Sequence, residues 1–455
     1  MSEQALVNES NKISGRDSGI SSGKSSGLDS GDSTRALANP NLRLYFAGQV
    51  VSMIGTWMQQ MALSWLIYRL TNSTYMLGLV AFASQAPSFL LTPFAGIVAD
   101  KVNRKKLVIV TQTLAMVQAG LLAFLAFSHQ PAIWQLIALG AFSGLINAFD
   151  LPTRQTFLVD MLRSREELPN AIAINSSITT LTRLIGPAFA GIFIAWAGEA
   201  MCFVVNAVSY IAVIAALCFV HVKPKTATQA ASPRSALVLL KEGFVYAFSF
   251  TPIRALLGLV ACISLFVMPY TVLMTAFARD VFHGDATTLG ILTAASGVGS
   301  LAAALYLATR KGVLGLGKWI VASCAMFGLG LVLFGFCHSL WLAVPALALV
   351  GFGSMILLAA SNTVLQTLVD EDKRGRVMSI YMMCFMGLAP FGSMAAGALS
   401  AHFGLGNTVI ACGIIATLLA VAFAARLKVI REHARPVYIE RGILNAEAEM
   451  KVLNA

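Results

Sequence analysis

The sequence predicts an all-α membrane protein in which twelve transmembrane helices form two six-helix bundles. The first supporting observation is composition: 57% of the 455 residues are hydrophobic and only 12% are charged, whereas a soluble domain carries roughly 25% charged residues. The second is length, because apolar runs of about 20 residues recur along the chain and each can cross a hydrocarbon core roughly 30 Å thick. The third is a polar stretch at 223–234 that divides these runs into two sets of six.

Each set of runs defines one predicted bundle, with ends placed to within a few residues by flanking charges and turn residues. The linker between the bundles, 223–250, contains an amphipathic segment at 235–250 that is expected to lie along the membrane surface. The runs of the N-terminal bundle (39–222) cover roughly 43–68, 75–99, 107–128, 133–158, 170–197 and 201–221, and those of the C-terminal bundle (251–428) cover roughly 254–278, 288–309, 318–337, 340–368, 377–401 and 406–427.

Polar tails are predicted at both ends of the chain. Ser-Gly pairs recur every four residues from Ser14-Gly15 to Ser30-Gly31, and such a tract buries too little apolar surface to offset its chain entropy. Residues 1–38 are therefore expected to be a disordered tail without the apolar segment of a cleaved signal peptide. Residues 429–455 form the second tail.

The distribution of Lys and Arg predicts the orientation of the chain, because cytoplasmic loops of membrane proteins are enriched in these residues. With both termini in the cytoplasm, only Arg69 and Arg279 of the 32 basic residues lie outside, and Arg183 lies within a run, which leaves 29 on the cytoplasmic side. We therefore predict a multi-pass protein of the cytoplasmic (inner) membrane. The net charge of +11 then reports topology and not nucleic-acid binding.

No metal and no organic cofactor is expected. The seven cysteines lie in apolar runs without CxxC spacing, and the six histidines are scattered. Residues 312–318 have the spacing of a phosphate-binding loop, but Trp319 stands where a Ser or Thr hydroxyl must hold magnesium, and no strand precedes them. ATP binding is therefore not expected, and an ion gradient is the predicted driving force.

The loop GIVADKVNRKK, 96–106, places five charged residues within seven positions between the second and third runs. Gly96, Asp100, Lys101, Arg104 and Lys105 resemble the loop signature of the major facilitator superfamily. The sequence departs from that signature at Asn103, where the family usually has glycine. Because asparagine tolerates the left-handed backbone conformation better than other non-glycine residues, we expect the turn to be kept.

A wider resemblance covers almost the whole chain. NPNLRLYFAGQVVSMIGTWM opens the first run, a segment from Phe149 to Gly191 joins the fourth and fifth, and VDEDKRGRVMSIY joins the tenth and eleventh. These segments are similar to the superfamily branch that includes enterobactin-type siderophore exporters and macrolide efflux proteins. The resemblance implies the major facilitator fold, alternating access and a small-molecule substrate.

Weak internal similarity supports two related halves, as a duplicated transporter requires. Val159-Asp160 near the end of the fourth run corresponds to Val369-Asp370 near the end of the tenth. Gly186-Pro187 corresponds to Ala389-Pro390. The counterpart of the charged loop, 308–319, keeps basic residues and glycines but has no acid, so the repeat is asymmetric.

Charges inside the apolar runs are candidate coupling residues, because an ionised group in hydrocarbon costs several kcal/mol. Asp150 is the acid within a run, Arg154 lies one turn further along, and Arg183 lies near the middle of the fifth run. One interpretation is a charge network that proton or substrate binding rearranges. The other, equally supported, is a fixed ion pair that holds the fourth and fifth runs together.

The charged loop also has two interpretations. Asp100 can accept hydrogen bonds from the N-terminus of a neighbouring helix, while Arg104 pairs with a nearby acid. In the family this cluster braces the two halves while the cytoplasmic side is closed, so the resemblance implies a gate latch. A plain positive-inside anchor explains Lys101, Lys105 and Lys106 but leaves Asp100 without a role, and we favour the latch.

Neutral polar and aromatic residues in the runs are candidates for the substrate cavity, although a single one more often makes an interhelical hydrogen bond. Small residues and prolines in the runs are candidates for helix packing and hinges. The cavity candidates are Gln59, Gln60, Gln85, Asn147, Asn175, Tyr270, Asn362 and Tyr381, and the packing candidates are Gly186, Pro187, Gly191 and Pro390.

The sequence therefore predicts a secondary transporter that exports a small organic molecule, such as a siderophore or a drug, against an inward proton flux and that functions as a monomer. Direction and coupling follow from the resemblance. An importer or facilitator of a small metabolite is the alternative. A passive channel would need a continuous polar stripe and a membrane-embedded enzyme would need clustered catalytic groups, and the sequence offers neither.

Overall fold

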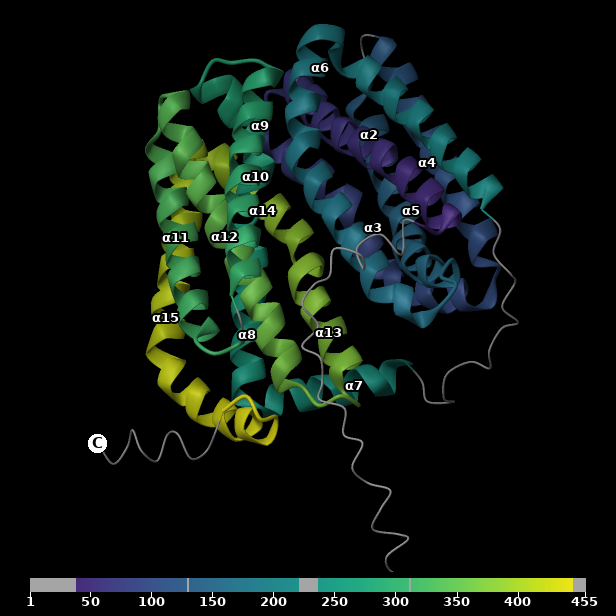
Figure 1. The fold of residues 1–455 in the computed structure, drawn as a ribbon. Coiled ribbons are helices and arrows are strands. Elements are labelled where there is room, and N and C mark those ends of the chain that lie inside the picture. The colour runs from purple at the N-terminus through teal and green to yellow at the C-terminus, as the bar shows by residue number, and fades with distance from the viewer. Residues whose placement is uncertain (1–37, 129–130, 221–235, 311, 445–455) are drawn as a thin grey trace, which may run out of the picture.

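The computed structural model describes residues 38–128, 131–220, 236–310 and 312–444, and within these ranges the regular structure is entirely helical. The helices form two bundles that lie side by side (Figure 1). The first bundle contains α2 (Pro40–Thr71), α3 (Thr74–Lys101), α4 (Arg104–Phe127), α5 (Ile133–Asp160), the short η1 (Arg165–Glu167) and α6 (Leu168–Phe219).

The second bundle follows α7 (Ala236–Ser249), a helix that lies across its lower end in Figure 1. Two of its crossings are interrupted by short π-helical turns, which are often found at functional positions in helices. The seventh crossing consists of α8 (Thr251–Cys262), η2 (Ile263–Val267), α9 (Tyr270–Ala276) and η3 (Phe277–Val281). The next three crossings are α10 (Ala286–Thr309), α11 (Leu316–Phe336) and α12 (Leu340–Leu368). The eleventh crossing consists of α13 (Arg374–Met382), η4 (Met383–Gly387) and α14 (Ala389–Phe403), and the twelfth is α15 (Leu405–Glu440).

Local sequence explains where several helices begin and end. The Ser73 side chain accepts from the amide of Met76 at the start of α3, and Asp285 accepts from the amides of Thr287 and Thr288 at the start of α10. Such caps satisfy the amides that a first helical turn leaves without partners. Between the eleventh and twelfth crossings Gly404 takes φ 86°, which favours glycine.

Ten of the described helical segments are long and apolar enough to cross a membrane. One of them, α6, is interrupted at Gly198 (φ 80°) and therefore makes two crossings. The remaining crossing, the first along the chain, is α2, which is 32 residues long but carries Gln49, Gln59 and Gln60. The predicted fold class, twelve transmembrane helices in two bundles, is confirmed.

Close approach of small residues holds neighbouring helices together. In lipid the hydrophobic effect does not drive helices together, so packing of small residues contributes more of the association energy. A Cβ atom on Gly353 of α12 would lie 2.7 Å from the carbonyl oxygen of Ser323 in α11, and Gly299 of α10 and Gly351 of α12 leave no room for a side chain at the α10–α12 contact. Glycine is thus required where these helices touch.

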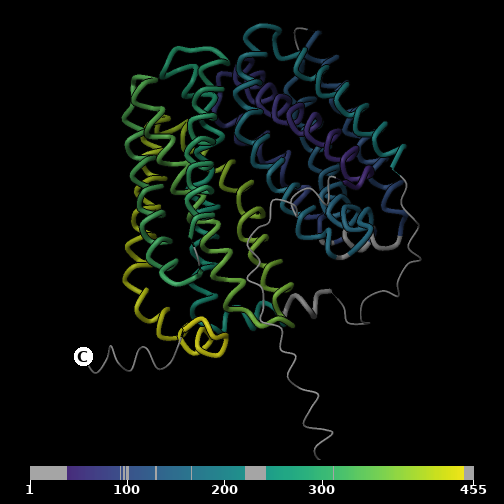
Figure 2. Tube along the Cα trace, viewed as in Figure 1, coloured from purple at the N-terminus to yellow at the C-terminus, as the bar shows by residue number. Residues whose placement is uncertain are grey.

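The two bundles meet at one end and diverge toward the other (Figures 1 and 2). The diverging end carries Arg104 and Lys105 in the first bundle and Arg374 and Arg376 in the second, and we call it the basic face. The opposite end, where α2 ends and α3 begins, is called the far face. The bundles contact each other mainly through α3 with α14 and α6 with α10.

Candidate functional site

Two glycine crossings close the far face between the bundles. In the first, a Cβ atom on Gly78 of α3 would lie 2.5 Å from the carbonyl oxygen of Ser393 and 3.2 Å from the Cα of Gly397 in α14. In the second, a Cβ atom on Gly191 of α6 would lie 2.6 Å from the carbonyl oxygen of Ala286 and 2.9 Å from the Cα of Gly290 in α10. Backbone therefore lies against backbone at both crossings.

Polar contacts reinforce this closure. The Tyr68 hydroxyl at the end of α2 donates to the Asp280 carboxylate in η3, and Arg279 Nη1 donates to the Tyr68 carbonyl oxygen at 3.3 Å. Thr74 Oγ1 at the start of α3 donates to the Gly397 carbonyl oxygen at 3.0 Å. Each of these bonds joins the first bundle to the second.

Tyr68 and Asp280 are not among the functional residues predicted from the sequence. Asp280 lies at the very end of the seventh crossing and its carboxylate is part of an exposed residue, so it does not stand out as a charge in hydrocarbon. Its partner is 212 residues away in the sequence. The signal that was available was an acid and a tyrosine at corresponding ends of the first and seventh runs.

Arg183 lies on the side of α6 that faces the space between the bundles. On this helix Thr182 contacts Met53 of α2, and Leu184 contacts Gly297 of α10. With about 100° between successive residues, the Arg183 side chain projects between those two contacts. It is exposed, and it makes no hydrogen bond or ion pair with any residue that the structure describes.

The lipid-facing side of the same helix is distinct. Ile185, Phe189 and Ile192 are 39%, 60% and 62% exposed and lie on the side opposite Arg183. Ser176, which shares the Arg183 side two turns earlier, is exposed as well. The fifth crossing therefore presents an apolar face to lipid and a polar face to the interbundle space.

Three of the cavity candidates are exposed within their crossings. Gln60 shares one side of α2 with Trp57 and Ser64, which are three residues before it and four residues after it. Trp57 contacts Gly186 of α6, and the Ser64 hydroxyl lies 3.2 Å from the Thr275 hydroxyl in the second bundle. Gln85 of α3 and Asn147 of α5 are also exposed.

Gln85 lies between two residues that contact the other bundle. The Phe82 ring packs against Phe391 with centroids 5.4 Å apart, and Phe89 contacts Gly387. These two phenylalanines and Gln85 share one side of α3, because they are three or four residues apart. Gln85 therefore faces the second bundle.

The other candidates are at least half-buried. Asn175 is half-buried, and Asn362 is half-buried and accepts from Gln366 Nε2 at 3.2 Å. Tyr270 and Tyr381 are buried, with hydroxyls bonded to Ser296 at 3.3 Å and to the Leu358 carbonyl at 3.2 Å. In this conformation they connect helices of the second bundle.

Gln59 is buried in a network that joins helices of the first bundle. Its Nε2 donates to Gln118 Oε1 at 3.0 Å, and its Oε1 accepts from Asn206 Nδ2 at 2.8 Å. Gln118 in turn donates to the Leu139 carbonyl oxygen at 3.1 Å. The network connects α2, α4, α5 and α6, which is the interhelical role that single polar residues in membranes most often have.

Asp150 and Arg154 form a buried ion pair. Arg154 Nε lies 2.6 Å from Asp150 Oδ2, although its N–H is not well directed at the oxygen. Thr111 Oγ1 and Gln112 Nε2 of α4 donate to Asp150 Oδ1 at 2.7 and 2.8 Å, and Arg154 Nη1 donates to Gln49 Oε1 of α2 at 3.1 Å. The pair joins α5 to α2 and α4, and the structure does not bring Arg183 to it.

At the basic face of the first bundle, Arg104 donates to both carboxylate oxygens of Asp160 at 3.2 and 3.0 Å. Lys105 Nζ donates to the carbonyl oxygens of Cys218 and Val220 at 3.3 and 2.8 Å, at the end of α6. A cation at a helix C-terminus is favoured by the helix dipole. These two residues of the loop motif therefore tie α4 to α5 and α6.

Gly96, Asp100 and Lys101 lie at the end of α3, and their side chains are outside the described part of the structure.

The expected left-handed turn at Asn103 is wrong. Asn103 has φ −66° and ψ 110°, and its side chain accepts from the Lys106 amide at 3.1 Å. It is the N-cap of α4, a position at which asparagine is strongly favoured because its oxygen satisfies a free helical amide. Asparagine at this position is therefore explained by capping.

At the basic face of the second bundle, α7 contacts α13 and the loop that precedes it. Arg376 Nη1 donates to Glu242 Oε2 at 2.9 Å, and the Tyr246 hydroxyl donates to Asp370 Oδ2 at 3.1 Å. Burial raises the pKa of Tyr246 from its ordinary value, so its hydroxyl remains a donor. Asp370, the counterpart of Asp160, thus has a partner in the linker helix in addition to Lys373.

The packing candidates lie at helix contacts. A Cβ atom on Gly186 would lie 2.7 Å from Trp57, and Gly191 contacts Gly290 as described above. Pro187 is inside α6, with its carbonyl oxygen against Gly290, and Pro390 is buried at the start of α14. Among the described residues there is no group of three or more His, Cys, Asp or Glu side chains that could hold a metal ion.

A family model described as transmembrane secretion effector matches residues 33–441, nearly the whole chain. The chain belongs to this family of the major facilitator superfamily. The transporter is 14% identical to the nucleoside transporter NupG, whose crystal structure superposes with a TM-score of 0.70 over 86% of this chain and 99% of that one. The predicted superfamily is confirmed.

Curated relatives of this transporter are membrane transporters and not enzymes. It is 25% identical to the staphyloferrin A transporter of Staphylococcus aureus over 84% of this chain and 95% of that protein. It is 24% identical to the multidrug efflux pump Tap of Mycolicibacterium fortuitum (89% and 100%) and to the enterobactin exporter of Citrobacter koseri (75% and 81%). The predicted resemblance to siderophore exporters and drug efflux proteins is confirmed.

Proposed function

We propose that this transporter exports a small organic anion from the cytoplasm by alternating access, with the basic face in the cytoplasm. The observation that carries the proposal is Arg183, an exposed cation on the interbundle side of α6 without a partner among the described residues. An unpaired guanidinium at this depth is costly unless water or a ligand satisfies it. A carboxylate or phosphate oxygen of a substrate supplies that partner through charge-assisted hydrogen bonds.

Polar residues on other crossings of the first bundle support a substrate that also accepts and donates hydrogen bonds. Gln60, Gln85 and Asn147 are exposed within their crossings, and their amides can bind carbonyl and hydroxyl groups. Relatives named as exporters and efflux pumps support the direction. The concentration of Lys and Arg on the basic face supports its assignment to the cytoplasm.

Coupling to protons is assigned to Asp150 and Arg154. Protonation of the Asp150 carboxylate would remove the charge that faces Arg154, and the arginine would then be free to reorganise around Gln49 of α2. That change would alter how α5 packs against α2 and α4. In this scheme an inward proton and an outward substrate use different residues of the same bundle.

The loop motif is assigned to the cytoplasmic gate. In the present conformation Arg104 and Lys105 hold α4 against α5 and α6 within the first bundle. The proposed latch would form between this loop and the second bundle when the basic face closes. Asp100→Ala should reduce transport without loss of membrane insertion, and full activity of this variant would leave the motif as an anchor.

The proposal is tested with the purified protein in vesicles of known orientation, using staphyloferrin A and enterobactin as the first probes. Uptake into inside-out vesicles should be saturable, and it should increase when the vesicle interior is made more acidic than the medium, because an antiporter lets protons leave as substrate enters. Arg183→Gln should reduce transport at least about tenfold while the melting temperature stays unchanged, because no described residue depends on Arg183. A transport rate that the gradient leaves unchanged would remove the antiport mechanism.

One observation favours a facilitator as the second candidate. The Asp150 carboxylate already receives an ion pair and two hydrogen bonds, and a charge satisfied in this way can serve packing alone. A facilitator would show saturable flux and counterflow that follow only the substrate gradient. Counterflow with no effect of pH would therefore support it over the exporter.

A further inference from the structure

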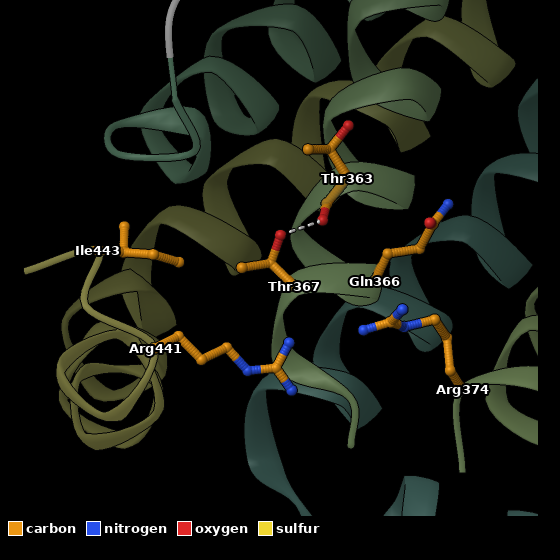
Figure 3. Close-up of a pocket in the computed structure, with 6 residues that line it drawn as sticks. All are labelled: Thr363, Gln366, Thr367, Arg374, Arg441 and Ile443. Atoms are coloured by element: carbon orange, nitrogen blue, oxygen red, sulfur yellow. Dashed lines mark hydrogen bonds between the residues drawn. The ribbon is translucent and has the colours of Figure 1, made fainter. Parts of the chain in front are cut away.

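A recess of about 380 Å³ lies at the basic face of the second bundle. It is lined by Thr363, Gln366 and Thr367 of α12, by Arg374 at the start of α13, and by Arg441 and Ile443 after α15 (Figure 3). The recess is open toward solvent, and its lining is mainly polar. The recess is therefore formed where α12, the start of α13 and the segment after α15 come together.

A helix-ending turn places Arg441 in the recess. Gly442 has φ 66°, the Gly442 amide donates to the Ile439 carbonyl at 3.0 Å, and the Ile443 amide donates to the Tyr438 carbonyl at 2.9 Å. This pair of bonds is the glycine-dependent motif that reverses a chain after a helix. Because α15 has 36 residues and is therefore about 54 Å long, its end extends beyond a core about 30 Å thick.

Arg374 and Arg441 both line the recess, and one of the Arg374 donors has no acceptor among the described residues. Arg441 Nη2 donates to the Val369 carbonyl at 2.8 Å, at the end of α12, which fixes its guanidinium. Arg374 Nε is shielded from solvent and has no acceptor among the described residues. Figure 3 shows both guanidinium groups below the polar side of α12, near Gln366 and Thr367. The Arg374 side chain is 39% exposed as a whole, so the terminal part of its guanidinium is available to a ligand in the recess.

The acids near the recess are engaged elsewhere or held loosely. Glu371 Oε1 lies 3.7 Å from Arg374 Nη2, but its side chain is 89% exposed. Asp370 is bonded to Lys373 at 3.3 Å and to Tyr246 at 3.1 Å, on the side of α7. An exposed carboxylate at this distance is a weak competitor in water, so the recess keeps an excess of positive charge.

We propose that this recess binds the phosphate group of an organic anion. Two arginine guanidinium groups match the geometry of phosphate oxygens, and the Gln366 amide and the Thr363 and Thr367 hydroxyls match the polar part of a ligand. Basic pockets among the ends of transmembrane helices are a known setting for anionic lipid headgroups. A soluble phosphate ester has the same chemistry. Binding would link the ends of α12 and α15 to the start of α13.

The test measures binding to the purified full-length protein in two arms. In the first, native mass spectrometry compares retention of phosphatidylglycerol with retention of phosphatidylcholine. In the second, melting temperature is followed with glycerol 3-phosphate against chloride at equal ionic strength. Binding in the first arm alone identifies a lipid headgroup, and binding in the second identifies a soluble phosphate ester. Absence of a preference in both arms overturns the proposal.

Variants separate a binding role from a structural one. Arg374→Gln should weaken binding at least about tenfold, whereas Arg431→Gln, an exposed arginine on the same face of the molecule in α15, should leave it unchanged. Glu371→Gln should strengthen binding because it removes a competitor for Arg374, and this variant remains informative if Arg374→Gln does not fold. Equal binding by the wild type, Arg374→Gln and Glu371→Gln would exclude the site.

Discussion

Replacing Gly191 with alanine should shift the transporter toward a conformation that is open at the far face. The new Cβ atom would lie 2.6 Å from the Ala286 carbonyl oxygen and 2.9 Å from the Gly290 Cα, whereas ordinary contact begins at 3.4 Å. Both neighbours are backbone atoms, so no side-chain rotation relieves the clash, and α6 and α10 must separate by about 0.8 Å at this point. The strain arises only while the far face is closed.

The expected size of the effect follows from the cost of overpacking. Extra atoms in a packed contact cost about 1–3 kcal/mol, and this cost shifts a two-state equilibrium by a factor of about 5–150. The far-face-open state should therefore rise from a minor to a readily detected population. Gly78→Ala, at the other crossing, should act in the same direction because its Cβ would meet the Ser393 carbonyl at 2.5 Å.

The assay is a distance distribution between spin labels at Ser128, after α4, and Ser339, before α12, in a variant that lacks the native cysteines. Both positions are exposed at the far face of different bundles. Gly120→Ala is the matched control, because a Cβ atom there meets nothing within 4 Å. An unchanged distribution in Gly191→Ala, or an equal shift in Gly120→Ala, would refute the argument that these crossings hold the far face closed.

Three further predictions concern charged contacts. Asp280→Asn should favour opening of the far face by about 1 kcal/mol, since a hydrogen bond to a charged group at a partly exposed site is weakened, and the same label pair measures it. Asp150→Asn should lower the free energy of unfolding by about 3–5 kcal/mol, because Arg154 stays buried without its counter-charge. Adding Arg154→Gln to this variant should restore the melting temperature. If transport also returned in the double variant, Asp150 would not be the proton carrier. Arg104→Gln should cost about 1 kcal/mol of stability, and a double-mutant cycle with Asp160→Asn should show coupling between the two residues.

The fold was accessible from sequence because the membrane imposes simple constraints. A crossing must be about 20 residues long and apolar, and basic residues cluster at one side. Details that depend on tertiary structure were not predicted. The break in α6 is a single glycine, Gly198, with φ 80°, and one glycine hardly changes the hydropathy of an apolar run. The turn at Asn103 was assigned to the wrong mechanism because asparagine favours both left-handed backbone and helix capping.

The candidate site was only partly accessible. Asp150 and Arg154 are four residues apart, so helical geometry alone places them together, and their contact is observed. Arg183 carries a charge at mid-crossing like them, but which way it faces depends on how α6 packs against α2 and α10. Gly191 is conspicuous in sequence, whereas its partner Gly290 becomes identifiable only when the two helices are seen to cross. Contacts between distant helices are therefore the part that sequence patterns leave open.

The two halves are alike where the bundles touch and different at the basic face. The far-face crossings Gly78–Gly397 and Gly191–Gly290 join the second crossing to the eleventh and the fifth to the eighth, so each bundle contributes equivalent helices. At the basic face, Asp160 pairs with Arg104 of its own bundle, whereas Asp370 pairs with Lys373 of its own bundle and also with Tyr246 of α7. The loop before α11 has no acid and does not reproduce the motif of the first half. We therefore expect closure at the basic face to involve the linker helix in a way that closure at the far face does not.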